Sequence, residues 1–165
     1  MGKVEQPRDL FQEKLAEMVY VERTLAEDVL PELRDEVDST ELRDGFREHL
    51  EQTRGHLSNL ERVAEMLGLD VSEKKSHALD GMIKEHAQGV KHIERAELRD
   101  LFDAGAAATT EHYEISYYES LVSMAETMGE EEAANLLREN LEQEEQTLRK
   151  LESASQKLTR QVVGA

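Results

Sequence analysis

The chain of 165 residues carries a formal net charge of −17 and contains no cysteine. Its length suits one domain with a single core, spanning 1–165, and the absence of cysteine excludes disulfide bonds, zinc–thiolate sites and thiol catalysis. The negative charge should repel nucleic acids and anionic membranes, so we expect neither as a partner. Because no run of about 18 apolar residues occurs and the first residues lack the apolar segment of a signal peptide, the sequence predicts a cytoplasmic protein.

Charged residues make up 35% of the chain, whereas aromatic residues make up 4%. An acidic surface stays hydrated at high salt, so adaptation to a saline cytoplasm is one hypothesis for this balance. Many cytoplasmic helical proteins are also acidic, and the alternative without such adaptation stays open.

Apolar residues recur with a helical period along almost the whole chain, and no alternating strand pattern occurs. The only prolines are Pro7 and Pro31, so no proline interrupts a helix after the first one. The periodicity predicts five helices, over residues 8–35, 40–67, 73–94, 96–128 and 130–160.

Several helix ends are marked by residues that favour them. The stretch 38–41 is typical of a helix cap, Gly68 is expected to end the second helix, and Gly129 the fourth. Ser72 is the expected cap of the short third helix, whose two glycines weaken its helical pattern. Short connections make neighbouring long helices antiparallel. The predicted fold is therefore all-α, a four-helix bundle of two antiparallel helical hairpins with an additional short helix.

A carboxylate occupies the centre of the apolar stripe of the first helix. At 100° per residue, the apolar residues around Glu22 all lie within about 60° of it, and they are Leu15, Met18, Leu25, Ala26 and Val29. Burying an unpaired charge costs several kcal/mol, so Glu22 should meet a compensating group.

The other three long helices also place polar residues on their apolar faces. Glu111 lies within the face of the fourth helix and Glu114 at its edge, whereas Glu144 lies near the centre of the fifth. His49 and His56 both fall inside the face of the second helix. Every long helix therefore contributes at least one inward polar group.

These groups also lie at similar depths in the two hairpins. Glu22 precedes the first turn by about 15 residues and Glu144 follows the second by about 14, which is roughly 20 Å along either helix. The level facing Glu22 falls between the two histidines, and the level facing Glu144 falls beside Glu114, within reach of Tyr118. Side-by-side packing of the hairpins would bring all of them together at mid-bundle.

Carboxylates and imidazoles inside a four-helix bundle are the ligands of paired first-row transition metals. The Glu-x-x-His pattern common in such proteins is absent from the second and fifth helices. The alternative is that Glu22, Glu111 and Glu144 reach solvent or pair with arginine, and that both inward histidines are hydrogen-bonded core residues. The remaining histidines are expected at the surface or behind the ligands, and they are His77, His86, His92 and His112.

Three segments resemble the YciF-like branch of the ferritin-like superfamily: YVERTL at 20–25, HLEQTRGHLSNLE at 49–61 and EHYEISYYESL at 111–121. The resemblance covers nearly the whole chain. It implies a five-helix ferritin-like bundle, a homodimer, a dimetal site and an association with stress responses. It supports five metal ligands, namely Glu22, His56, Glu111, Glu114 and Glu144.

This chain departs from the family pattern at two positions. Gln52 stands where the family usually has a second acidic residue, and Leu148 stands where it usually has Asp. Loss of two oxygen donors would weaken metal binding, reduce it to one ion, or leave a vestigial site.

Three functions follow from these observations. The first is a protein with two iron ions, or manganese, that oxidises Fe(II) or consumes peroxide, with Tyr118 as donor of a proton or an electron. The second is a non-catalytic stress or structural protein with a degraded metal site, which the residues at 52 and 148 favour. The third is a hydroxylase or oxidase acting on an organic substrate, which requires a pocket.

Overall fold

The computed structural model describes residues 4–72 and 74–164, and over these residues it contains helices and connecting turns but no strand. The long helices match the predicted ones closely. The elements in chain order are α1 (Pro7–Thr24), the π-helix η1 (Leu25–Val29), α2 (Leu30–Glu36), α3 (Thr40–Leu67), α4 (His77–Gly89), the 3₁₀-helix η2 (Val90–His92), α5 (Ala96–Thr127) and α6 (Glu131–Val163).

Most of the expected helix ends are confirmed. Ser39 caps α3 by accepting a hydrogen bond from the Leu42 amide. Gly68 ends this helix with φ 62°, and Gly129 follows α5 with φ 78°, a left-handed conformation that glycine adopts without steric cost.

The short helix α4 begins later than the sequence predicted. Its cap is Ser76, whose side chain accepts from the Leu79 amide, and not Ser72, whose hydroxyl instead donates to Asp70 Oδ1 at 2.7 Å. The expected start at position 73 lies outside the described residues. Both serines are good cap residues, but only Ser76 is buried and bonded to Tyr113 of α5, at 2.8 Å, so tertiary contact selects it.

The first helix contains an irregularity that the sequence analysis missed. Within η1 the backbone hydrogen bonds span five residues instead of four, so the Leu30 amide donates to the Leu25 carbonyl. Pro31 follows directly and has no amide to donate, so it cannot restore the normal ladder at this point. Single π-turns of this kind occur frequently at functional sites, and this one begins three residues after Glu22.

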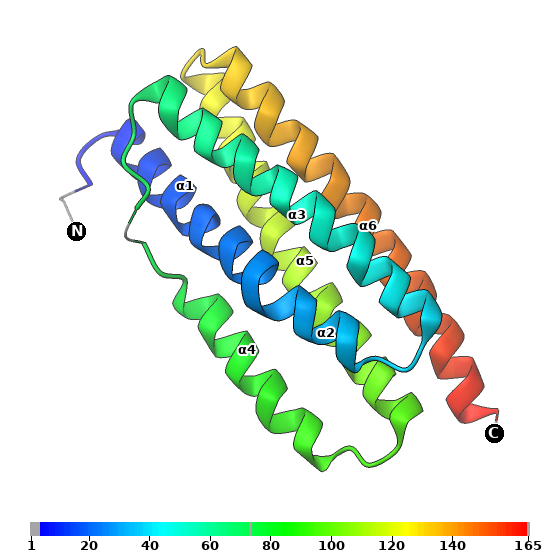
Figure 1. The fold of residues 1–165 in the computed structure, drawn as a ribbon. Helices are drawn as coiled ribbons and strands as arrows, with labels where there is room; N and C mark the ends of the chain where they lie inside the picture. Colours follow the sequence, from blue (N-terminus) through cyan, green and yellow to red (C-terminus); the bar gives the residue numbers. More distant parts are fainter. Residues whose placement is uncertain (1–3, 73, 165) are drawn as a thin grey trace.

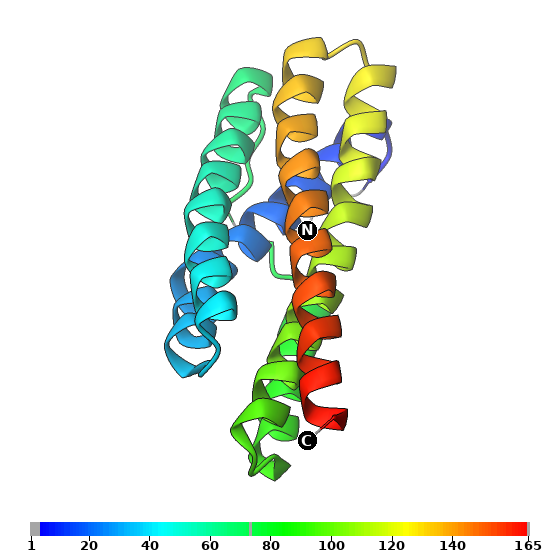
Figure 2. The ribbon, with the colours of Figure 1, turned by 90° about the vertical axis from the view of Figure 1, so that its right-hand side faces the viewer.

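Two antiparallel hairpins form the bundle, as expected. The rod α1–η1–α2 pairs with α3, and α5 pairs with α6 (Figures 1 and 2). The short α4 connects the hairpins and lies outside the four long helices, beside the α1–α2 rod and α5. The buried Asp100 of α5 joins the hairpins at one end, because its carboxylate accepts from the amides of Asp38 and Ser39 at 3.0 and 2.8 Å.

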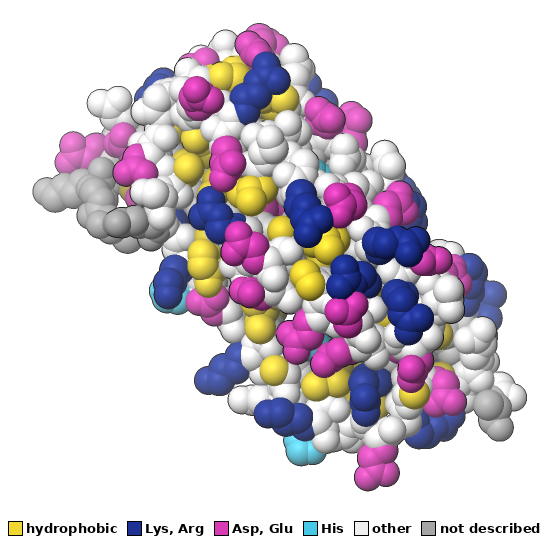
Figure 3. Space-filling model, in the orientation of Figure 1, with side chains coloured by type: hydrophobic (Ala, Val, Ile, Leu, Met, Phe, Trp, Pro, Cys, Tyr) yellow, Lys and Arg dark blue, Asp and Glu magenta, His cyan; other side chains and the backbone are white. Residues whose placement is uncertain are grey.

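The core runs the length of the bundle and consists mainly of leucine, valine and alanine, with Phe11, Phe46 and Tyr118 as its largest members. On the face drawn in Figure 3, acidic and basic side chains alternate over the surface and apolar ones show between them. Among the described residues, no helix is both long and apolar enough to cross a membrane.

Candidate metal centre

Six ionisable side chains from four helices meet in the middle of the bundle. They come from α1, α3, α5 and α6, and each is at most 3% exposed; they are Glu22, His49, His56, Glu111, Glu114 and Glu144. The five residues expected as ligands are therefore brought together, and His49 joins them. We call these six residues the central cluster.

The central cluster divides into two groups that share Glu144. In one group, ligand atoms of His49, Glu111, Glu114 and Glu144 all lie within 4.8 Å of one another. In the other, the same holds for Glu22, His56 and Glu144. Each group combines carboxylate oxygens with one imidazole, which is a donor set that can hold a metal ion.

Close distances join the histidines to the carboxylates. His49 Nε2 lies 3.0 Å from Glu111 Oε1. His56 Nδ1 lies 2.9 Å from Glu144 Oε1 and 3.5 Å from Glu22 Oε1. The recorded ion pairs of these three carboxylates are all with histidine, so the alternative of arginine pairing fails within the described residues.

Many of the oxygen and nitrogen atoms of the central cluster that could bind a metal ion make no hydrogen bond. Apart from the contacts with histidine given above, neither carboxylate oxygen of Glu114 or Glu144 has a hydrogen-bond partner, and neither do Glu22 Oε2, Glu111 Oε2 or the Nδ1 atoms of the two histidines. Buried polar atoms without partners are costly. Six such side chains in one place therefore need a compensating species, and cations fit this donor set.

Burial changes the proton affinities of the cluster. It raises the pKa of Glu22, Glu114 and Glu144, and it raises that of Glu111 to about 8. Burial lowers the pKa of His49. For His56 burial acts in the same direction, but Glu22 and Glu144 outweigh it and raise the pKa to about 11. Protons thus partly compensate the carboxylates when no cation is present.

A second layer of side chains orients the central cluster. His56 Nε2 donates to Gln143 Oε1 at 3.1 Å, which leaves Nδ1 as the nitrogen that faces Glu22 and Glu144. Ligating histidines in metalloproteins are commonly held through their other ring nitrogen in this way. Gln143 is a residue that the sequence analysis missed, because its role depends on the packing of α6 against α3.

Tyr118 lies in this second layer. Its hydroxyl donates to Glu22 Oε1 and accepts from Asn140 Nδ2 at 3.1 Å. Asn140 also accepts a hydrogen bond from Asn59 of α3 at 2.8 Å, so a polar chain leads from α3 through Asn140 and Tyr118 to Glu22. Burial raises the pKa of Tyr118 well above its ordinary value, so the phenol stays protonated.

The two positions that depart from the family pattern lie outside these contacts. Gln52 accepts a hydrogen bond from Thr147 at 3.3 Å, and Leu148 is a half-buried member of α6. The six side chains of the central cluster therefore come together even though positions 52 and 148 carry glutamine and leucine.

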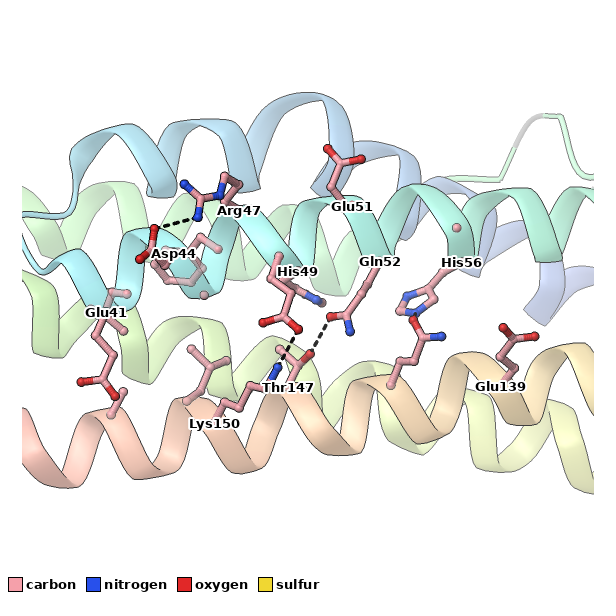
Figure 4. A pocket seen from close by; sticks show the side chains of 18 of the residues that line it. Glu41, Asp44, Arg47, His49, Glu51, Gln52, His56, Glu139, Thr147 and Lys150 are labelled. Atoms are coloured by element: carbon pink, nitrogen blue, oxygen red, sulfur yellow. Dashed lines mark hydrogen bonds and ion pairs between the residues drawn. The ribbon is translucent and has the colours of Figure 1, made fainter.

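A polar cavity between α3 and α6 reaches the central cluster from one side. Its volume is about 1150 Å³, and His49, Gln52 and His56 of α3 point across it toward α6 (Figure 4). Acidic residues predominate on its rim, where Lys150 pairs with Glu48 at 2.8 Å.

The remaining histidines lie outside the central cluster. His77, His92 and His112 are exposed, as expected. His86 is half-buried on α4, where its Nε2 lies 2.8 Å from Asp103 Oδ1 of α5 and its ring stacks on Phe102. It contacts neither group of the central cluster, and its pair with Asp103 joins α4 to α5.

The sequence favours His49 as a hydrogen-bonded core histidine over a metal ligand, whereas the structure places it in the central cluster. The signal that would have included it is its spacing from His56, since seven residues bring two side chains to the same helix face. Sequence could not distinguish the two roles, because a histidine on an apolar face looks the same whether it meets a carboxylate or a backbone carbonyl.

The fold and the cluster together define a ferritin-like helical bundle with a buried carboxylate–imidazole centre. Residues 6–163 match the family described as "Domain of unknown function (DUF892)", and the chain belongs to that family. Protein YciF of Escherichia coli strain K12 is 34% identical to the chain over 140 residues, which is 84% of either protein.

Solved structures agree with the family assignment. The crystal structure of the Escherichia coli stress protein YciF matches with a TM-score of 0.90 and 31% identity, over 95% of this chain and 99% of that one. YcfI of Rhodopseudomonas palustris matches with a TM-score of 0.87 and 29% identity, over 91% and 95%. A protein of Xanthomonas campestris at 21% identity, with a TM-score of 0.78 over 96% and 97%, shares the fold.

Proposed function

We propose that this protein holds two first-row transition-metal ions in the central cluster, with iron as the preferred metal and manganese as the alternative. We further propose that it serves a stress-related role by oxidising Fe(II) or consuming peroxide. The main support is the convergence of four buried carboxylates and two buried imidazoles, several of whose ligand atoms have no partner other than histidine. The stress role is supported by the description of its Escherichia coli relative as a stress protein.

The donor chemistry fits this assignment. Carboxylate and imidazole suit iron and manganese, whereas no thiolate is available to select softer metals. Glu144 is common to both groups and is the residue best suited to serve two ions, while His49 and His56 each supply one nitrogen. A bound pair of iron ions would supply the two electrons that reduction of peroxide requires.

The surrounding residues position the ligands and hold protons. Gln143 keeps the Nδ1 atom of His56 free of its proton in the neutral ring, and Asn140 holds the Tyr118 hydroxyl against Glu22. Tyr118 is therefore placed to deliver a proton at Glu22 Oε1. The polar cavity between α3 and α6, with its acidic rim, offers divalent cations an approach to both histidines.

The second candidate is a non-catalytic stress or structural protein. It is favoured by the glutamine and leucine at positions 52 and 148 and by the description of Rhodopseudomonas palustris YcfI as a candidate structural protein. Assembly as a homodimer and a cytoplasmic location remain predictions under both candidates.

Anaerobic titration with Fe(II) after treatment with a chelator tests the proposal directly. We expect two ions per wild-type chain and, on admission of air, Fe(II) oxidation faster than in buffer. The Glu144→Gln variant should lose binding at both positions. Its matched control is Glu145→Gln, because Glu145 is the next residue of α6 and forms only a partly exposed pair with Arg149 at 3.6 Å.

The outcomes separate the candidates. A wild-type protein that binds no metal contradicts the proposal and favours the non-catalytic candidate. A protein that binds two ions without accelerating oxidation contradicts the catalytic part alone. Equal binding by wild type and Glu144→Gln would remove the central cluster as the metal site.

A further inference from the structure

A second cavity also reaches the central cluster, and fewer charged side chains line it than line the polar cavity. It has a volume of about 760 Å³ and lies between the η1–α2 segment, α4 and α5. Its walls are mainly apolar and include Leu25, Val29, Leu33, Met82, Ile83 and Phe102. Sites for small organic ligands have this size and this predominantly apolar lining.

The inner end of this cavity is polar and belongs to the central cluster. His49 and Glu111 both line it, and both are buried. His49 Nδ1 and Glu111 Oε2 have no hydrogen-bond partner. Thr109 and Thr110 also line the cavity, but their hydroxyls bond carbonyls of their own helix at 3.0 and 3.3 Å. The lining atoms that are free to hydrogen-bond a ligand therefore lie at the inner end of the cavity.

The charges on the lining select against anions. Glu32, Glu36 and Glu85 contribute three carboxylates, against Lys91 and the half-buried His86. The chain as a whole adds a formal charge of −17. A carboxylate ligand such as a fatty acid would be repelled, whereas an uncharged molecule would not.

We propose that this cavity binds an uncharged organic molecule with an apolar body and one polar end, of the class of medium-chain alcohols. The body lies between α4 and η1–α2, and the polar end faces His49 and Glu111. The placement of the apolar part of the ligand depends only on the cavity. The role of the polar end, which brings the ligand to the metal centre, rests on the proposed function.

The π-turn contributes directly to this site. Leu25 and Val29, at the two ends of η1, both line the cavity, and Glu22 of the central cluster lies one turn earlier. The opposite wall is α4, which is attached by the His86–Asp103 pair and by the Tyr20 hydroxyl, a donor to Asp80 Oδ1 at 2.6 Å. The irregular segment and the extra helix thus serve the same cavity.

Two glycines make a matched pair of filling variants. Gly105 lines the apolar cavity and Gly55 lines the polar one, and an added Cβ meets nothing within 4 Å at either. Both lie within long helices, so Gly105→Leu and Gly55→Leu make the same exchange in the same backbone. Neither residue belongs to the central cluster.

The probe is N-phenyl-1-naphthylamine, an uncharged fluorophore that brightens in apolar sites, with 1-decanol and decanoate as competitors. We expect saturable binding to wild type in the presence of a chelator, with displacement by 1-decanol and not by decanoate. Gly105→Leu should weaken binding at least about tenfold, because the new side chain occupies the cavity. Gly55→Leu should bind as wild type does.

Co(II)-loaded protein tests the position of the polar end. There, 1-decanol should change the visible absorption of Co(II) in wild type and not in Gly105→Leu. Absence of saturable probe binding, or equal loss in both glycine variants, would overturn the proposed cavity ligand. Displacement without a change in Co(II) absorption contradicts the placement of the polar end. A chain that binds 1-decanol but no Co(II) supports the cavity ligand and contradicts the proposed function.

Discussion

Tyr118 and Glu22, 96 positions apart in the chain, form a buried hydrogen bond in which the phenol donates to the carboxylate. The bond joins α5 to α1 and hence one hairpin to the other at the level of the central cluster. It also accounts for only one of the two Glu22 oxygens, and the other, Oε2, has no partner.

The Tyr118→Phe variant tests the role of this hydroxyl. Removing it leaves Glu22 without its buried donor, so we expect a loss of about 1–2 kcal/mol in the free energy of unfolding with chelator present. Fe(II) binding should persist while Fe(II) oxidation slows, because the proton donor is missing. The control is Tyr117→Phe, since the Tyr117 ring is only half-buried and lies under Lys14. Equal oxidation rates in wild type and Tyr118→Phe would rule out proton or electron donation by Tyr118.

Glu22→Gln tests whether the buried carboxylate compensates a cation. With chelator, the variant should melt at the same temperature as wild type or higher, because glutamine removes the cost of burying a carboxylate, which is the largest influence on Glu22. With Fe(II) or Mn(II) at a hundredfold excess over Kd, wild type should gain about 2.7 kcal/mol for each bound ion, and the variant should gain much less. The exposed Glu27→Gln serves as control. An equal gain in wild type and Glu22→Gln would show that Glu22 is not a ligand.

The pair of His86 and Asp103 should make stability depend on pH. Asp103 raises the pKa of His86 through their hydrogen bond, against the effect of burial, and Glu36 and Glu32 act in the same direction as Asp103. Because the pKa of His86 is higher in the folded state, the pair stabilises the fold fully at pH values below the unfolded pKa of about 6.5. This stabilisation is lost as the pH rises through the folded pKa. Urea unfolding should therefore show a larger difference between wild type and Asp103→Asn at pH 5.5 than at pH 9. A difference that is constant or grows with pH would contradict this assignment.

Two glycines of α4 should respond oppositely to alanine. At Gly89 a Cβ would lie 2.5 Å from Phe102 Cζ, so the Phe102 ring must leave its stack on His86. At Gly81 a Cβ meets nothing within 4 Å. Gly81→Ala should stabilise by up to about 1 kcal/mol through helix propensity, whereas Gly89→Ala should be destabilising. Thermal melting of both variants gives the comparison, and similar gains at both positions would show that Phe102 moves without cost.

The acidic composition predicts a response to salt. If the charge of −17 reflects a saline environment, screening should relieve self-repulsion and raise the melting temperature between 0.1 and 2 M KCl. Thermal melting across this range is the measurement. A flat or falling midpoint would leave the acidic surface without a halophilic explanation.

The sequence by itself determined the helices and the candidate residues of the site. A helical period needs only local side-chain spacing, and Ser39, Gly68 and Gly129 act on their own helix ends through local hydrogen bonds and backbone conformation. The depth of Glu22 and Glu144 in their hairpins follows from a constant rise per residue, so their meeting at mid-bundle could be predicted without coordinates.

Tertiary structure decided which polar groups face one another. Gln143 reaches His56 only because α6 packs against α3, and His49 is a member of the central cluster only because α5 and α6 bring carboxylates to it. The cap of α4 is Ser76 because it also contacts Tyr113. The apolar cavity exists because pairs between distant residues hold α4 beside α5 and the η1–α2 segment. Such contacts depend on distances between helices, which a period along one helix does not encode.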